Sequence, residues 1–261
     1  MDYKRNVYHS RMQDFLKEIK SKDIKYNLMI LDPPFGKIVK KDWDKETFKF
    51  TDEIINNLYD TLEDDGSIYL HCGMGPKSNS LIEWFPLFNN KFKFQDKITW
   101  KKTRGIGMRR GWLQVSEDIL WFTKSKKFKH RWNVENQYSN EKRPFNVVRK
   151  GGEMVNKSEY KRHTTVWDIP ELGFGKSPTK LKEIKKNISH LTPKHPKLSD
   201  RMIKAHCDEN SRVFIPFAGS GMEILSCLHN NVFFDAVDND IENCHMINKY
   251  VLSGEIKFTD F

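Results

Sequence analysis

The stretch RVFIPFAGSGMEILSCLHNNVFFDAVD, residues 212–238, contains a complete strand, loop, helix and strand pattern. Its two apolar ends, 212–217 and 232–238, have the composition of buried strands, and residues 221–230 between them predict a helix. Two strands joined by one helix lie parallel in the same sheet. The stretch therefore predicts an α/β domain built on a parallel sheet.

The loop of this unit has the features of a nucleoside site. Gly219 and Gly221 lie between strand and helix, where glycine lets a ligand approach the backbone closely. Asp238 ends the next strand, 17 residues after Gly221, and a carboxylate there can accept both hydroxyls of a ribose. No Gly-Lys-Ser/Thr follows, which disfavours a nucleoside triphosphate. A tight structural turn is the alternative interpretation.

A second buried strand, YNLMIL (26–31), is ended by Asp32-Pro33-Pro34-Phe35. The prolines stop the strand and stiffen the loop. Asp32 and the Pro33 carbonyl can both accept hydrogen bonds from an exocyclic amine, which frees a nitrogen lone pair otherwise conjugated into a base. Phe35 offers a face on which a flipped-out base can stack. The alternative is a strand-ending turn with a capping aspartate.

The remaining pattern extends the α/β alternation. Strands are expected at 5–9, 67–72, 97–101 and 118–123, and helices at 11–20, 47–62 and 196–207. Residues 126–165 are polar, basic and weakly periodic, and predict a partly irregular insert. We expect residues 1–125 and 166–261 to be two halves of one domain, separated by this insert.

The positive charge is concentrated in one quarter of the chain. Residues 101–165 hold 17 lysines and arginines and six acids, a net +11, whereas the whole chain carries +10. Such a segment favours a polyanion, above all a nucleic acid, as partner. A basic loop that is merely solvated is the alternative.

Other sequence features restrict the location of the protein. The four cysteines lack the spacing of a zinc site, so we expect reduced thiols and no bound metal. There is neither a run of 18 apolar residues nor an apolar stretch near the N-terminus. These features predict a cytoplasmic protein without a membrane partner.

The ordered set of motifs resembles the beta group of DNA amino-methyltransferases, in which Asp-Pro-Pro-aromatic precedes the target-recognition region and Phe-x-Gly-x-Gly follows it. Asp42-Trp43-Asp44, ITWKK (98–102), EDILWFTKS (117–125), VWDIP (166–170) and HLTPKHPKLSDRMI (190–203) extend the resemblance over nearly the whole chain. It implies a Rossmann-like fold of S-adenosylmethionine-dependent methyltransferases, with circularly permuted motif order and an inserted target-recognition region. It also implies double-stranded DNA as substrate and, because members often dimerise, a homodimer.

The resemblance assigns roles to individual residues. Asp32, Pro33, Pro34 and Phe35 would hold and activate the target amine, with Asp32 also bordering the cofactor. Asp238 would bind the cofactor ribose, and Lys194 with Thr192 its methionine carboxylate. The remaining cofactor contacts would be Arg11, Met12, Phe217, Gly219, Ser220 and Gly221. The basic segment itself, apart from the resemblance, supplies the expected DNA-binding residues: Arg104, Arg109, Arg110, Lys124, Lys126, Lys127, Arg143 and Arg149.

Three positions differ from the family's usual residues. Ile215 stands where an aspartate is usual, Arg11 where an acid or asparagine is common, and Phe35 where tyrosine is usual. Adenine N6 is the expected target because Asp32 is the common choice in adenine enzymes, with cytosine N4 the alternative. A catalytically inactive DNA-binding homologue is a second alternative, and an RNA substrate a third.

Overall fold

The computed structural model describes residues 5–36, 44–75, 78–106, 110–125, 129–144, 159–172 and 193–261, with backbone alone for 104–106. Five predicted site residues therefore lie outside the described residues, together with the side chain of Arg104: Arg109, Lys126, Lys127, Arg149 and Thr192. Their roles remain predictions.

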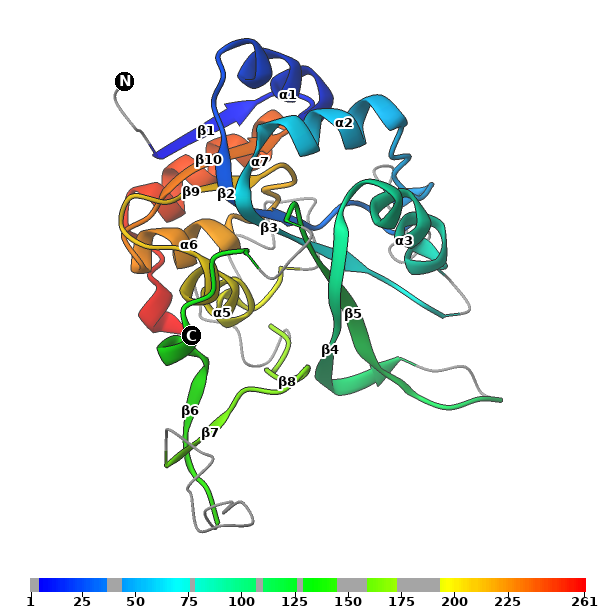
Figure 1. Cartoon of the computed structure of the whole chain (residues 1–261), viewed down its shortest axis with the longest axis vertical. Helices are drawn as coiled ribbons and strands as arrows, with labels where there is room; N and C mark the ends of the chain where they lie inside the picture. The colour runs from blue at the N-terminus through cyan, green and yellow to red at the C-terminus, as the bar shows by residue number, and fades with distance from the viewer. Residues whose placement is uncertain are drawn as a thin grey trace.

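One eight-stranded sheet organises the described chain, in the order β1-β10-β9-β2-β3-β5-β4-β8 (Figure 1). The first five of these strands are parallel, β5 is antiparallel to both β3 and β4, and β8 is parallel to β4. In sheet order the bounds are β1 Arg5–His9, β10 Phe233–Asp238, β9 Arg212–Ile215, β2 Tyr26–Leu31, β3 Leu62–Cys72, β5 Gln114–Thr123, β4 Lys93–Ile106 and β8 Val166–Asp168.

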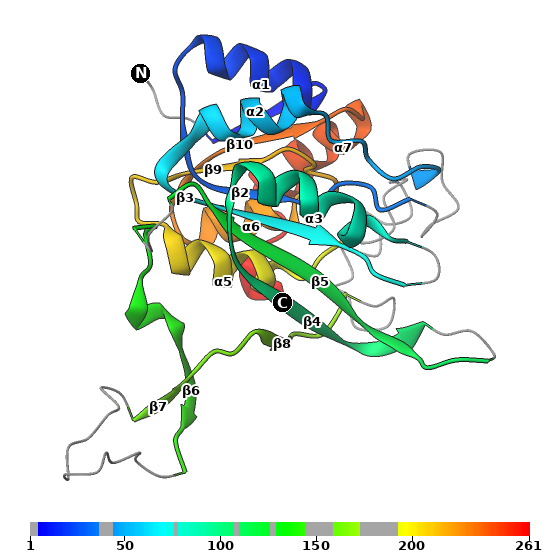
Figure 2. The same cartoon turned by 45° about the vertical axis from the view of Figure 1, so that its right-hand side comes forward.

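Helices cover both faces of the sheet (Figure 2). One buried apolar cluster joins the sheet to the first three helices, and a second joins its other face to the C-terminal helices. The first set is α1 Met12–Ser21, α2 Asp52–Thr61 and α3 Ser80–Lys91. The second is α5 Pro196–His206, α6 Met222–His229 and α7 Ile241–Met246, which continues as a π-helical turn, Ile247–Leu252. This arrangement confirms the Rossmann-like fold.

The two halves of the sequence are interleaved in this sheet. The C-terminal strands β9 and β10 lie between the N-terminal strands β1 and β2. A buried ion pair supports the junction: the Asp235 carboxylate, on β10, lies 2.5 Å from the Arg212 guanidinium and accepts a 2.7 Å hydrogen bond from the Tyr26 hydroxyl on β2. Neither half thus completes the sheet alone.

The structure corrects several predicted elements. The helix expected at 47–62 begins at Asp52, because Thr51 caps it by accepting a hydrogen bond from the Ile54 N–H, and Leu62 already belongs to β3. Helix α3 was not predicted, since Pro86 and the dense aromatics of 80–91 hide its periodicity. Helix α7 was also missed.

The strands expected at 97–101 and 118–123 are longer than predicted and form one antiparallel hairpin, β4–β5. Asp118 pairs with Cys72, the last residue of β3. The described residues 102–106 and 110–115 therefore extend beyond the carboxyl edge of the parallel strands, as Figure 2 shows. The hairpin overhangs the edge on which ligands bind in sheets of this kind.

The first residues of the insert pack against the domain. Trp132 stacks on Trp121 of β5, with ring centroids 5.0 Å apart, and the Asn133 amide donates to the Lys204 and Cys207 carbonyls at the end of α5. A 3-10 turn, Val134–Gln137, leads into an antiparallel ribbon of β6 Tyr138–Lys142 and β7 Tyr160–Arg162, which projects from the body (Figure 1). Among the described residues, no helix is long and apolar enough to cross a lipid bilayer.

Candidate active site

Two loops predicted to carry the chemistry follow neighbouring parallel strands. The register of β2 against β9 pairs Leu28 with Val213 and Met29 with Phe214. Continued three residues past Met29 and Phe214, this register places Asp32 opposite Phe217. The Asp-Pro-Pro-Phe loop and the glycine loop therefore meet at the carboxyl edge, although 185 residues separate them in sequence.

The Asp-Pro-Pro-Phe loop is held from several sides. The Phe35 carbonyl accepts hydrogen bonds from the Thr47 hydroxyl (3.1 Å) and the Ser78 hydroxyl (2.9 Å). Gly36, at φ +79°, donates its N–H to the buried Asp44 carboxylate at 2.8 Å. Phe48 N–H donates to the Pro34 carbonyl at 3.0 Å. These bonds fix the carboxylate, carbonyl and ring that the loop presents.

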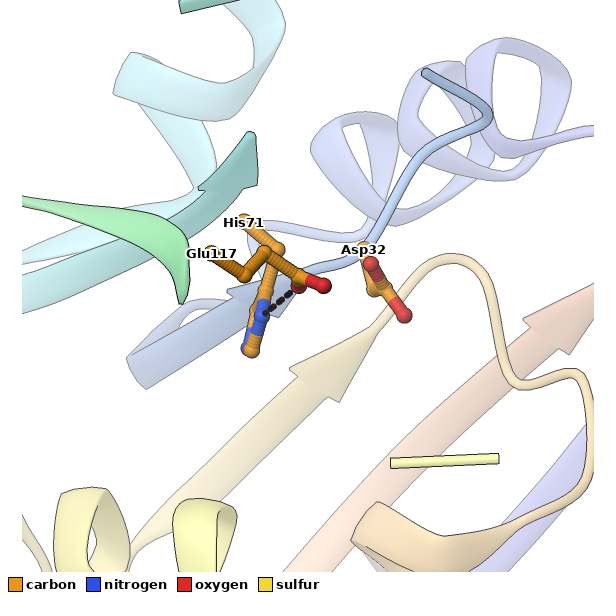
Figure 3. Close-up of side chains that lie close together, drawn as sticks. All are labelled: Asp32, His71 and Glu117. Atoms are coloured by element: carbon orange, nitrogen blue, oxygen red, sulfur yellow. Dashed lines mark hydrogen bonds and ion pairs between the residues drawn. The ribbon is translucent and has the colours of Figure 1, made fainter. Parts of the chain in front are cut away.

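A buried ammonium joins Asp32 to two other side chains. Lys194 Nζ lies 3.3 Å from Asp32 Oδ1 and 2.6 Å from Glu117 Oε1, and its side chain is 10% exposed. His71 Nδ1 lies 3.2 Å from the same Glu117 oxygen. The dashed line in Figure 3 marks this contact. One ligand atom each from Asp32, His71 and Glu117 lies within 4.8 Å of the others, a grouping that also suits a metal ion. In this structure the Lys194 ammonium supplies the positive charge beside both carboxylates.

Opposite charges keep this centre ionised despite its burial. Desolvation opposes the charge of Glu117, but Lys194, Lys102 and the His71 hydrogen bond hold its pKa well below the ordinary value. Desolvation would likewise lower the pKa of Lys194, whereas the carboxylates of Asp32 and Glu117 raise it above its usual value. Lys102 completes the network, 2.8 Å from Glu117 Oε2. Asp32 is thus presented next to a permanent positive charge.

Glu223 is a further buried carboxyl group near Asp32. It lies in the first turn of α6, directly after the glycine loop, and is 7% exposed. Desolvation, reinforced by the negative charge of Asp32, raises the pKa of Glu223 to about 7. The group therefore exchanges its proton near neutral pH.

We expect Glu223 to make folding stability fall as pH rises. Its pKa is about 7 when folded and near 4.5 as an ordinary glutamate, so the folded state holds the extra proton between these values. Stability declines through that window, and the full cost, roughly 3 kcal/mol, applies above it. Glu223→Gln should remove this decline, as measured by urea unfolding at pH 5 and pH 8. Equal pH dependence in both proteins would contradict the assignment.

The glycine loop is joined to Asp238 by a hydrogen bond. Gly219 and Gly221 have φ of +48° and +75°, and Gly219 N–H donates to Asp238 Oδ2 at 2.7 Å. Ser10 N–H donates to the Asp238 carbonyl at 2.9 Å, which brings the turn before Arg11 and Met12 to the same place. The partly exposed Phe217 contacts Phe48, with centroids 5.1 Å apart. The structure thus brings together the glycine loop, Asp238 and the turn that precedes Arg11.

Two of the positions that differ from the family's usual residues differ in burial. Ile215 is buried in the apolar core at the end of β9, so no carboxylate lies there. Arg11 is exposed and precedes α1, while Met12 is buried against the helices of that face.

The predicted DNA-binding residues are spread over different parts of the molecule. Arg110 is exposed near the end of the β4–β5 hairpin, and the Arg143 guanidinium donates to the Tyr160 carbonyl at the end of the ribbon farther from the body. Lys124 departs from expectation: its side chain is 13% exposed, 3.0 Å from Asp64, and bonded to the Leu62 carbonyl. It follows β5 at the edge opposite Asp32, so we exclude it from the DNA-facing set.

Sequence reasoning missed Glu117, His71 and Lys102 as members of the site. They come from β5, β3 and β4, which are neighbours only in the folded sheet. The one signal in the sequence is the acid Glu117, two residues before the apolar run of 119–122, and an acid beside a strand does not by itself indicate a site. His195 has a structural role: its Nδ1 accepts the Lys197 N–H at the start of α5.

Comparison with known proteins identifies a matching family and two similar relatives. A family model described as DNA methylase, of the N6/N4 methyltransferase type, matches residues 26–249. The type II methyltransferase M1.MboII of Moraxella bovis is 29% identical over 82% of this chain and 84% of its own. M.HpaI of Haemophilus parainfluenzae is 31% identical over 78% of this chain and 61% of its own.

Solved structures show the same fold at low sequence identity. M1.HpyAVI, solved in complex with SAM, superposes with a TM-score of 0.61 at 21% identity, over 94% of this chain and 99% of that one. The cytosine-N4-specific PvuII DNA methyltransferase gives 0.66 at 14% identity, over 98% of this chain and 90% of that one.

Proposed function

Because the chain belongs to the N6/N4 family of DNA methylases, we propose that it transfers a methyl group from S-adenosylmethionine to adenine N6 of a flipped-out base in double-stranded DNA. The observation that carries this proposal is Asp32, fixed at the carboxyl edge opposite the glycine loop and beside the Lys194 ammonium. An acid at this place is what amine activation requires.

The loop provides two acceptors for the target amine. Asp32 accepts one hydrogen bond from the NH₂ group and the Pro33 carbonyl the other. In the described part of the chain, no hydrogen bond reaches the Pro33 carbonyl, whereas the Pro34 carbonyl is used by Phe48. Phe35 lies edge-on to Trp84 at 6.1 Å and keeps a partly exposed ring for the base. Together these groups hold the amine with its lone pair directed away from them.

Transfer is direct and in line. S-adenosylmethionine supplies an electrophilic sulfonium methyl group. The amine nitrogen forms the new N–C bond as the S–C bond breaks, and the nitrogen then releases a proton to water or through Asp32. The mechanism has no covalent enzyme intermediate, and the buried thiol of Cys72, whose pKa is raised by desolvation, has no part in it.

The loops that meet at this edge would hold the cofactor. Phe217, Gly219, Ser220 and Gly221 would contact it, and Asp238 would bind its ribose. The turn of Arg11 and Met12 would border its adenine, and Thr192 with Lys194 would bind its carboxylate. In this assignment residues 1–125 and 166–261 form the catalytic domain, and 126–165 reads the target with Arg143 and Arg149. Arg104, Arg109, Arg110, Lys126 and Lys127 contribute further DNA contacts.

We expect incubation of unmethylated DNA with methyl-labelled S-adenosylmethionine to give labelled N6-methyladenine after digestion to nucleosides. Labelled N4-methylcytosine would instead assign the cytosine activity. Absence of label in DNA, with cofactor binding intact by calorimetry, would favour an inactive DNA-binding homologue. RNA in a parallel reaction should stay unlabelled.

A further inference from the structure

The tip of the β4–β5 hairpin exposes a large apolar side chain that the activity proposed above does not use. Trp112 is 98% exposed and its neighbour Leu113 is 66% exposed. Nothing lies within 4 Å of a Cβ placed on Gly111, so the backbone beside Trp112 is also open. Exposing both side chains to water is unfavourable unless another molecule covers them.

Trp112 lies beyond the edge of the sheet that carries Asp32. Asp118 is level with the end of β3, and Trp112 precedes it by six residues along the hairpin. At about 3.3 Å per residue, an extended strand reaches up to roughly 20 Å beyond that edge. Figure 2 shows the hairpin extending away from the body of the domain. Trp112 therefore projects on the side from which a nucleic acid would approach Asp32.

A chain of contacts connects the tip to Phe35. The Gln114 amide donates to the Met74 carbonyl at 2.9 Å. Gly75 N–H donates to the Ser78 carbonyl at 2.9 Å, and the Ser78 hydroxyl donates to the Phe35 carbonyl, also at 2.9 Å. Gln114, two residues from Trp112, is thus connected through these hydrogen bonds to the loop that receives the base.

The charge of the hairpin indicates which kind of molecule covers Trp112 and Leu113. Residues 103–116 contain three arginines, Arg104, Arg109 and Arg110, and no acid. Two copies of such a tip would repel each other, whereas a phosphate backbone would attract it. Apolar side chains that enter between base steps next to phosphate-binding arginines are a known way to unstack and kink a duplex.

We propose that Trp112, supported by Leu113, inserts into the DNA beside the target base. There it stacks on the bases that flank the target in the duplex. The indole acts as a positioning group: it lowers the cost of holding the target out of the helix and takes no part in methyl transfer. The proposal rests on the function proposed above and adds the residue that keeps the duplex open.

The test compares Trp112→Ala with wild type on two duplexes that carry the methylated site. Neither duplex carries a methyl group on the target base before the reaction; in one the target base is paired, and in the other a mismatch leaves it unpaired. Loss of base–aromatic stacking should lower kcat/KM about tenfold to a hundredfold on the paired duplex. On the mismatched duplex the loss of activity should nearly vanish, because the target base is already unpaired and flipping it out costs less free energy. Trp112→Phe should retain most activity on both.

Ile82→Ala is the matched control, since Ile82 is an exposed apolar residue on α3. 2-Aminopurine at the target position should become brighter with wild type and with Ile82→Ala, and much less so with Trp112→Ala. Equal activity of Trp112→Ala and wild type on the paired duplex, or an equal loss on both duplexes, would overturn the proposal. A lower Tm or a lost dimer in Trp112→Ala would do the same, by showing that Trp112 packs against protein. Failure of wild type to methylate either duplex would instead refute the proposed function.

Discussion

Asp32→Ala should lower the rate of methyl transfer by roughly a hundredfold or more, while the affinity for S-adenosylmethionine stays close to that of wild type. The carboxylate is a fixed acceptor at the reacting amine, and losing one such preorganised contact costs about this much. The measurement is single-turnover transfer of labelled methyl, with Kd for the cofactor obtained by calorimetry. Near-wild-type turnover would refute the role of Asp32.

Two further variants separate charge from hydrogen bonding at this position. Asp32→Asn retains an acceptor oxygen but removes the charge beside Lys194, so we expect intermediate activity. Asp168→Ala is the control, since Asp168 forms an exposed ion pair with Lys101 at 2.9 Å and such pairs contribute little. If Asp168→Ala reduced transfer as much as Asp32→Ala, the effect would not be specific to the active site.

Lys194→Met should lower the free energy of unfolding by about 3–5 kcal/mol, because it leaves the carboxylates of Glu117 and Asp32 without their shared cation in a buried place. Lys102 compensates Glu117 only in part, from a position that is more exposed. The measurement is urea unfolding at pH 7. A loss within about 1 kcal/mol would show that the lysine is not the counter-ion of this centre.

Lys101→Met provides the matched control for this stability effect. It makes the same chemical change in an exposed ion pair, and the expected loss is at most about 1 kcal/mol. Lys194→Arg keeps the positive charge and should recover much of the stability, although a guanidinium does not fit the ammonium's position between two carboxylates equally well.

Local sequence determined the core of the fold. Strand β2, the glycine loop and the unit 212–238 were predictable because apolar runs, prolines and glycines act over a few residues. Helix α3 escaped prediction since its sequence satisfies no simple period, and it is stabilised instead by burial of Trp84 and Phe88 in a cluster drawn from several elements. Tertiary packing there outweighs local preference.

The same distinction between local sequence and tertiary packing applies to the candidate site. The sequence by itself determined Asp32 and its loop, the glycine loop and Asp238, because each belongs to a contiguous motif whose chemistry is local. Only the tertiary structure decided that Lys194 joins Asp32 to Glu117, that Lys124 faces its own domain, and that Trp112 stands beyond the active-site edge. Those facts depend on which strands become neighbours and in which register, and register is set by the packing of the whole sheet rather than by any one segment.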